Sequence, residues 1–225
     1  GGEVYRIIKY DKDFKRIASC SLKSNESYTI IPFDAGEVSI DENYTDLVVY
    51  TSRLRLDGHQ SNIRITIDKE NMTLKERIGV NGFPEIHVSH SFRQIVRYDN
   101  DKLVYADLSD AYPLRSIYLQ SAYVNSPMLE IEGDYGDLTG LATSDDTYIV
   151  TGTYLHNNIN NVYVSCVSKA TGEVTGTWIT DCNVYNSNIA YAPRIIQISD
   201  NRYVLMWGTQ AGVDYIIMDK NTPVL

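Results

Sequence analysis

Short stretches of aromatic and aliphatic residues recur along the chain, and a polar segment follows each of them. Four stretches share one form and begin at residues 47, 103, 148 and 203. The intervals between them are close to the ~40–50 residues that one repeated β-unit occupies. We interpret residues 47–50, 103–106, 148–151 and 203–206 as the second strands of four-stranded units.

A hairpin precedes the second strand of each unit. Residues 95–101 and 195–201 align without a gap, and both run from an apolar stretch into a turn that contains Asp and Asn. Ser-Asp-Asp at 144–146 stands at the equivalent place in another unit. Asn and Asp favour tight turns because their side chains bond nearby backbone groups and tolerate left-handed conformations. The pattern therefore predicts a first strand that pairs antiparallel with the second.

A ladder of alternating apolar and polar residues follows each second strand. Ladders that end at a lysine-containing turn occupy residues 5–12, 63–69, 162–169 and 215–220. Shorter alternating stretches, at 74–78 and 174–180, come after two of these turns. Alternation with a period of two indicates strands with one buried face, here the third and fourth strands of a unit. The stretch 116–123 lacks the Asp-Lys turn and is the weakest match.

These units favour an all-β fold, a β-propeller of four-stranded antiparallel blades with about four to five blades present. A β-sandwich is the second interpretation. In a single repeat domain over residues 1–225, we expect a half blade at 1–30 and blades at about 31–82, 83–137, 138–184 and 185–225.

The pattern begins at a third strand and stops after another third strand. Either about five blades close a ring through one composite blade, or the chain is a segment of a larger propeller whose other blades belong to the same parent chain. We favour the segment, because the two incomplete units supply one third strand too many for a single blade. An open end would expose a sheet edge, which natural propellers avoid.

Charge and hydrophobic pattern exclude two kinds of partner. The 225 residues include 20 Lys and Arg against 29 Asp and Glu, and the net charge of -9 repels nucleic acid and anionic membrane surfaces. The apolar runs are far shorter than the ~20 residues of a membrane helix, so we expect no membrane insertion. Cys20, Cys166 and Cys182 are too scattered for a disulfide scaffold or a zinc site, and we expect buried thiols.

Candidate binding residues gather in loops on one face of the expected propeller. The loops between second and third strands are expected at 51–62, 107–115, 155–161 and 208–214, and this face and the central channel usually hold the ligand. The candidates in or beside the loops of this face are Arg53, Asp57, His59, His87, His90, Asp107, Asp110, Arg115 and His156. His87 and His90 have no third ligand at metal-binding spacing, so we expect no metal and no cofactor.

The sequence contains no recognised catalytic motif. It lacks G-x-S-x-G, H-E-x-x-H and a phosphate-binding glycine loop. The carboxylates of a glycosidase have no fixed spacing, so a pair among Asp57, Asp107 and Asp110 stays open. The 18 tyrosines could stack on sugars or form an interface, although strand packing accounts for most of them.

Two places in the chain resemble a family of uncharacterised bacterial β-propeller proteins that are often secreted or surface-associated. The first is His-Gln-Ser-Asn-Ile at 59–63; the second is Ser-His-Ser-Phe-Arg-Gln at 89–94, leading to Ala-Asp-Leu-Ser-Asp-Ala-Tyr-Pro at 106–113. The family pattern at the end of the second resembles Asp-His-Gly-Asp-Ala-Tyr-Pro-Arg, and here Leu108 and Ser109 replace His-Gly while Leu114 replaces Arg. The resemblance covers roughly the first half of the chain. It implies a fold and an extracellular setting, and no activity.

We therefore expect a non-catalytic binding or scaffolding propeller of a bacterial extracellular or cell-surface protein. Its ligand, a protein or a carbohydrate, is expected on the face that bears the histidines. The alternative is a glycoside-active propeller enzyme, which needs two carboxylates roughly 5–10 Å apart in the central channel.

Overall fold

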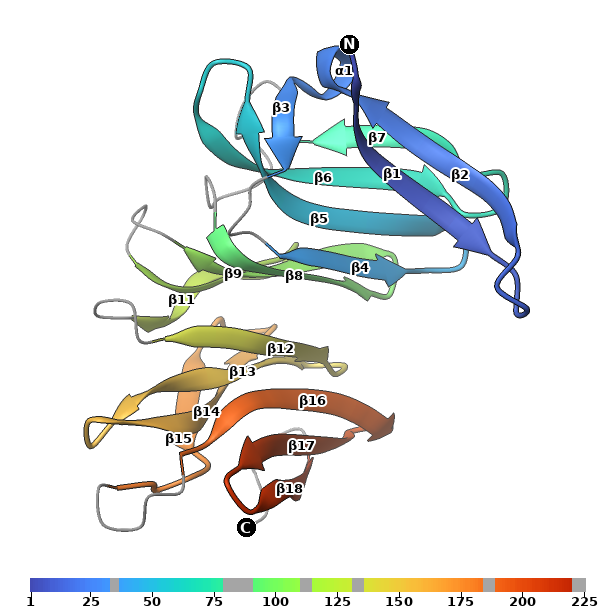
Figure 1. The fold of residues 1–225 in the computed structure, drawn as a ribbon. Helices are drawn as coiled ribbons and strands as arrows, with labels where there is room; N and C mark the ends of the chain where they lie inside the picture. The colour runs from blue at the N-terminus through green and yellow to red at the C-terminus, as the bar shows by residue number, and fades with distance from the viewer. Residues whose placement is uncertain (33–36, 79–90, 110–114, 131–135, 184–188, 220–225) are drawn as a thin grey trace. The chain divides into compact units, whose positions relative to one another are not determined.

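The computed structural model describes residues 1–32, 37–78, 91–109, 115–130, 136–183 and 189–219 (Figure 1). These residues form antiparallel β-sheets, and the one-turn α1 (Ser24–Ser27) is the single helix among them. Within these ranges, no helix has the length and apolar character needed to cross a membrane. The chain divides into two compact units, residues 1–103 and 104–225.

Unit 1, residues 1–103, contains two sheets of its own. A hairpin of β1 (Glu3–Tyr10) and β2 (Arg16–Lys23) forms the first. The second has the order β3-β5-β6-β7, and β4 also pairs with β5. Its strands are β3 (Thr29–Pro32), β4 (Val38–Glu42), β5 (Asp46–Arg55), β6 (Gln60–Asp68) and β7 (Thr73–Ile78). β8 (Ser91–Asp99) also lies in this unit.

Two short strands take the place of a single first strand in the second sheet. β4 pairs with residues 47–51 of β5, and β3 pairs with residues 53–55 along the same edge. The other edge of β5 pairs with β6 over its whole length. The core of unit 1 lies between the two sheets, where Cys20 and Leu22 of β2 pack with Val49, Ile63 and Ile65.

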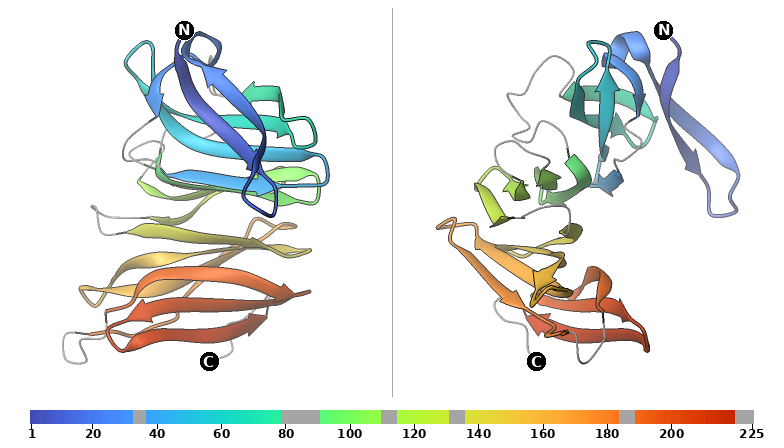
Figure 2. Two further views of the ribbon diagram at one scale, coloured as in Figure 1. Left: turned by 45° about the vertical axis from the view of Figure 1, so that its right-hand side comes forward. Right: turned by 60° about the vertical axis from the view of Figure 1, so that its left-hand side comes forward.

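Unit 2 contains the strands from β9 onward. β9 (Lys102–Ser109) begins at the boundary between the units and pairs with β10, which pairs with β11. The next sheets have the orders β12-β13-β14-β15 and β16-β17-β18 (Figure 2). The remaining strands are β10 (Ser116–Gln120), β11 (Asn125–Glu130), β12 (Asp137–Thr143), β13 (Thr147–His156), β14 (Ile159–Ser168), β15 (Val174–Trp178), β16 (Tyr191–Ser199), β17 (Arg202–Thr209) and β18 (Gly212–Asp219).

The core of unit 2 lies between the β12–β15 sheet and the β16–β18 sheet. Ile149, Val162 and Val164 of the first pack in one cluster with Leu205 and Trp207 of the second. Alternation directs these side chains to a single face of each sheet. Burying a large apolar side chain contributes ~1.5–3 kcal/mol, so this contact is a main source of the stability of unit 2.

The repeat pattern predicts the strands of both units correctly. The four predicted second strands are confirmed as β5, β9, β13 and β17, and the predicted third strands as β1, β6, β14 and β18. The aligned hairpins also share their turn conformation, because Asn100 (φ 56°) and Asn201 (φ 60°) are both left-handed. The weakest match, 116–123, forms β10 but ends at Gln120. The blade boundaries, the number of blades and the segment interpretation stay predictions.

The predicted loops between second and third strands are too long. Arg53 and Asp107 lie within β5 and β9, and His156 is the last residue of β13. The turn after β13 is only Asn157 and Asn158, with φ of 54° and 62°. Asparagine favours the two-residue turns with positive φ that continue a hairpin to its tip, so strands extend into the expected loops.

The three cysteines are free thiols. Cys20 and Cys182 are buried, and Cys166 is half-buried. Burial raises the pKa of Cys166 to about 11, which keeps this thiol protonated and unreactive at neutral pH.

Candidate functional site

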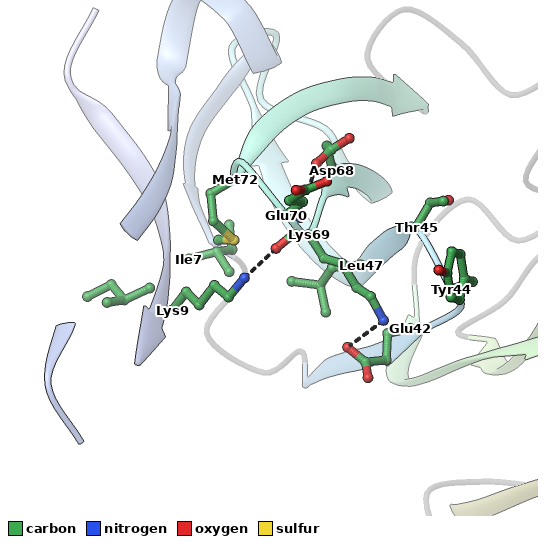
Figure 3. Close-up of a pocket in the computed structure, with 11 residues that line it drawn as sticks. Ile7, Lys9, Glu42, Tyr44, Thr45, Leu47, Asp68, Lys69, Glu70 and Met72 are labelled. Carbon is green, nitrogen blue, oxygen red and sulfur yellow. Dashed lines mark hydrogen bonds and ion pairs between the residues drawn. The ribbon is translucent and has the colours of Figure 1, made fainter. Parts of the chain in front are cut away.

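A cavity of about 770 Å³ opens in unit 1 beside the β4–β5 and β6–β7 turns (Figure 3). Its volume lies within the ~300–1,000 Å³ range of small-molecule sites. Three segments line it: Ile7, Ile8 and Lys9 of β1; Glu42, Tyr44, Thr45 and Leu47 around the first turn; and Asp68, Lys69, Glu70 and Met72 around the second.

The two turns that frame the cavity are fixed by their own side chains. Asn43 Oδ1 accepts hydrogen bonds from the backbone N–H groups of residues 45 and 46, at 3.0 and 2.7 Å. Asp68 Oδ1 accepts hydrogen bonds from those of residues 70 and 71, at 3.0 and 3.1 Å. Such bonds are the reason that Asn and Asp favour turns. The rim of the cavity is therefore encoded locally.

Two lysines connect the segments around the cavity. The Lys9 ammonium donates a hydrogen bond to the carbonyl of Lys69 (2.7 Å), and the Lys69 ammonium donates one to the carbonyl of Asn43 (2.6 Å). Lys69 Nζ also lies 3.6 Å from a carboxylate oxygen of Glu42 (Figure 3). An ammonium has three N–H donors, so Lys9 keeps donors for a ligand.

Carboxylates supply the acceptors of the cavity. Hydrogen bonds from the backbone of Asn71 and then Glu70, together with the charge of Lys75, hold the pKa of Asp68 below its ordinary value. Asp68 is therefore an ionised acceptor at neutral pH. With Glu42 and Glu70, it gives the lining three carboxylates against two ammonium groups.

Apolar and aromatic groups complete the lining. Ile7, Leu47 and Met72 form an apolar wall, since all three also pack in or against the core of unit 1. Tyr44, at the rim, is 92% exposed. A ring that no protein group covers offers a flat apolar face beside charged donors and acceptors.

Arg53, a predicted binding residue, is fully buried near the opposite end of β5. Its guanidinium donates hydrogen bonds to the carbonyl of Ser27, to Thr29 Oγ1 (3.1 Å) and to Ser61 Oγ (3.2 Å). Burial lowers the pKa of Arg53 to about 10, and burial likewise raises the pKa of Tyr5 to about 12. The Tyr5 hydroxyl is buried without a hydrogen-bond partner among the described residues. Arg53 thus ties backbone and side chains together instead of facing solvent.

The segments that resemble the bacterial family meet in a second buried network. Asn62 donates hydrogen bonds to the Tyr50 hydroxyl (2.8 Å) and to Ser91 Oγ (3.1 Å). Ser52 Oγ donates to the carbonyl of Ser91 (2.8 Å) and accepts from Gln94 Nε2 (2.8 Å). These bonds join β8 to β5 and β6. In this part of unit 1, the resemblance therefore reflects packing between strands.

Asp57 and His59 lie in the turn between β5 and β6. Asp57 forms an ion pair with Arg55 (2.6 Å), and its other oxygen accepts the backbone N–H of His59 (3.1 Å). Gly58, at φ +84°, adopts the left-handed conformation that the turn requires. The structure brings Asp57 and His59 together, and Asp57 is already occupied by Arg55.

The predicted residues of unit 2 have separate surroundings. Asp107 is buried in β9, and Arg115 is half-buried just before β10. His156 stacks on Trp178, with ring centroids 4.6 Å apart. His87, His90 and Asp110 lie outside the described residues. Among those that are described, no three His, Cys, Asp or Glu side chains are grouped to hold a metal ion.

The sequence indicates the turns of the cavity but not the cavity itself. The Asp68-Lys69 turn is recognisable as the end of a third strand, and Tyr44 as one tyrosine among 18. Their meeting with Lys9 depends on how the β1–β2 hairpin packs on the second sheet, which no local pattern encodes. A tyrosine inside a turn that Asn43 stabilises is the one signal that sequence reasoning could have used.

Comparison with known proteins gives neither a family nor a curated relative, since no family model and no curated protein matches the chain. Solved structures do match. A computationally designed protein, Ika4, has a TM-score of 0.40 and 15% identity, with 81% of this chain and 91% of that chain covered. An α-L-arabinofuranosidase from Lactobacillus brevis has a TM-score of 0.47 and 10% identity, with 83% and 74% covered.

A third similar structure is an α-L-arabinofuranosidase from Podospora anserina in complex with cellotriose. Its TM-score is 0.47 at 9% identity, with 87% of this chain and 66% of that chain covered. The glycoside hydrolases among these neighbours are propeller enzymes. At such identities no activity carries over, and what holds for this chain is an all-β fold whose described residues form antiparallel sheets of two to five strands.

Proposed function

We propose that this protein is a non-catalytic binding protein and that a carbohydrate occupies the cavity between Lys9, Tyr44 and Glu70. The observation that carries the proposal is the combination in one open cavity of about 770 Å³: an exposed aromatic ring, an apolar wall, and ammonium and carboxylate groups. Binding sites of this kind are mostly apolar, with a few polar groups that fix orientation.

The chemistry of a sugar ring fits this lining. A pyranose presents C–H groups on its faces, which pack on an aromatic ring such as that of Tyr44. Its hydroxyls both donate and accept, so they can bond Asp68 or Glu70 and the free donors of Lys9 together. A flat polar ligand without such an apolar face would leave Tyr44 unused.

The charge of the lining favours a neutral ligand over a polyanion. Three carboxylates outnumber the two ammonium groups of the cavity, and the whole chain carries a net charge of -9. Like charges across a binding surface repel, so phosphorylated or sulfated ligands are disfavoured. The expected ligand is a neutral glycan, which agrees with the predicted extracellular or cell-surface location.

A glycan array followed by calorimetric titration tests the proposal. We expect Tyr44→Ala to weaken binding of the selected glycan about tenfold or more, since one stacked aromatic ring contributes ~0.5–1.5 kcal/mol in addition to the free energy of the apolar area that it buries. Tyr123→Ala, which truncates another exposed tyrosine, is the matched control and should bind as the unsubstituted protein does. His59→Ala separates the cavity from the predicted histidine face: if it weakens binding and Tyr44→Ala does not, the ligand lies on that face.

Glycoside hydrolysis is the second candidate function, because Glu42, Asp68 and Glu70 line one cavity. Such an enzyme needs one carboxyl group that stays protonated as the general acid. The pKa of Asp68 is shifted the opposite way, and Glu42 is close to Lys69. The earlier candidate Asp57 is paired with Arg55. These contacts favour binding over catalysis.

A reducing-end assay on the selected glycan distinguishes the two functions. The binding proposal expects no release of reducing ends above the uncatalysed background during prolonged incubation. Release that Glu70→Gln and Asp68→Asn abolish, while both variants still bind the glycan, would establish hydrolysis in its place.

A further inference from the structure

Among the described residues, the β16–β18 sheet packs against another sheet on one face. Tyr203, Leu205 and Trp207 of β17 and Met218 of β18 point into the core that this sheet shares with β12–β15. Because side chains alternate along a strand, the residues between them point to the other face. That second face is the outer face of the sheet.

The outer face is mostly apolar. The ladder places Val204 of β17 opposite Ile196 of β16 and Ile217 of β18, so these three side chains form one row. The next row contains Arg194 of β16, Met206 and Tyr215. The Tyr191 ring lies over Gly208, where a Cβ would come within 2.4 Å of it, and Val213 pairs with the same glycine. Five of these side chains are 39–69% exposed: Tyr191, Ile196, Val213, Tyr215 and Ile217.

The same unit shows what a covered sheet looks like. β14, inside the β12–β15 sheet, has buried residues at five consecutive positions, 161–165, so both of its faces are covered. In β18 only Met218 is buried. The two strands have similar apolar character, and the difference lies in what covers them. A second sheet would bury the outer face as β12–β15 buries the inner one.

The free edge of this sheet is also suited to association. Among the described residues β18 pairs only with β17, in an unbroken register of eight pairs without a bulge (Figure 1). The segment Gly-Val-Asp-Tyr-Ile-Ile-Met-Asp contains neither lysine nor proline. Natural proteins blunt exposed edges with lysine, proline or bulges, and β18 uses none of these devices.

We propose that the outer face of β16–β18 binds the same face of a second copy of this chain, related by a two-fold axis. Its exposed apolar side chains present an accessible surface area on the order of 500 Å². This is about three-fifths of the roughly 800 Å² that each partner contributes to a standard interface. Homodimer interfaces have about this apolar share.

Charge favours a second copy over an acidic or a basic partner. The charged residues on the outer face are Arg194, Arg202 and Asp219, and Arg202 stands directly opposite Asp219 in the ladder. The face is therefore nearly neutral, although the chain carries a net charge of -9. Two copies meet here without the repulsion that other acidic surfaces would cause.

Sedimentation velocity over a concentration series from ~1 to ~100 µM tests this interface. We expect a reversible monomer–dimer equilibrium and no larger species. Tyr215→Arg should weaken dimerisation at least tenfold, because it places a charge at the centre of the apolar face. The Tyr215 side chain is mostly exposed, so the variant should fold, as checked by circular dichroism and thermal unfolding.

Two further variants keep the result decisive. Val213→Lys should weaken the dimer independently of Tyr215, and Tyr10→Arg, a matched change on an exposed tyrosine of unit 1, should leave it unchanged. A protein that is monomeric at every concentration contradicts the proposal and points to another sheet as the occupant. Polymers of increasing size, or a dimer that tolerates both face substitutions, contradict it as well.

Discussion

The two ends of the β5–β6 pair use polar residues for opposite purposes. At one end, Arg53 and Asn62 are buried and bonded to other groups of the protein. At the other end, Lys9, Tyr44 and Glu70 border an open cavity. The polar groups of the first end form hydrogen bonds within the folded protein, whereas those of the second end remain available to a ligand. A polar motif in a strand is therefore a poor guide to a binding site.

Burial explains why the two ends should respond differently to substitution. A buried donor or acceptor that loses its partner costs ~1–3 kcal/mol, because water cannot replace the bond. Removal of an exposed group lowers the free energy of unfolding only slightly, because water can hydrogen-bond to its former neighbours. Substitutions at the closed end should lower stability, and substitutions at the open end should lower only affinity.

The largest expected effect is that of Arg53→Met. The variant leaves the Ser27 carbonyl and the hydroxyls of Thr29 and Ser61 without the guanidinium, so we expect the free energy of unfolding to fall by about 3 kcal/mol. Urea denaturation measures this loss. Arg16→Met, on the exposed side of β2, is the matched control and should change it by less than about 0.5 kcal/mol. Equal effects of the two variants would remove the distinction between the ends.

A pair of asparagines compares the ends directly. Asn62→Ala removes bonds to Tyr50 and Ser91 inside the protein and should cost about 2 kcal/mol. Asn43→Ala removes the side chain that fixes the turn at the cavity, and should cost about 1 kcal/mol because its backbone partners can turn to water. The ranking is checked by the urea midpoints of the two variants; the reverse order would contradict the account.

Tyr5 provides a test by pH. Its folded pKa of about 12 lies above the ordinary value of 10, so its contribution to stability is complete below pH 10 and is lost as the pH rises through 12. Tyr5→Phe should change stability by less than about 1 kcal/mol at pH 8, since the hydroxyl has no partner among the described residues. Between pH 10 and 12 the variant should lose less stability than the unsubstituted protein. Arg53 is present in both proteins, so its own titration largely cancels. Parallel pH profiles would contradict the assignment.

The smallest expected effects are those at the rim of the cavity. Tyr44→Ala and Glu42→Gln should each change the free energy of unfolding by less than about 0.5 kcal/mol, because both side chains are mostly exposed. Thermal and urea unfolding give the comparison with Arg53→Met. A large loss of stability in either rim variant would mean that the cavity, too, is primarily a folding element.

The sequence predicts the strands well because their signals are local. Alternation identifies β6 and β14, and Asn100 and Asn201 mark turns that need a left-handed residue. It predicts Arg53 as a loop residue wrongly, since the length of a hairpin depends on a two-stranded register that continues beyond the apolar run. The cavity escapes prediction for a related reason: Lys9 and Lys69 are 60 positions apart and meet only through packing.

The central claim is that the cavity, and not the end of β5–β6 that bears Arg53 and Asn62, is the binding site. Calorimetric titration of an array-selected neutral glycan into the unsubstituted protein, Tyr44→Ala and Tyr123→Ala measures this most directly. We predict that Tyr44→Ala raises the dissociation constant about tenfold or more while the variant protein stays stably folded. Tyr123→Ala should leave the dissociation constant unchanged. Equal affinity of all three proteins would contradict the claim.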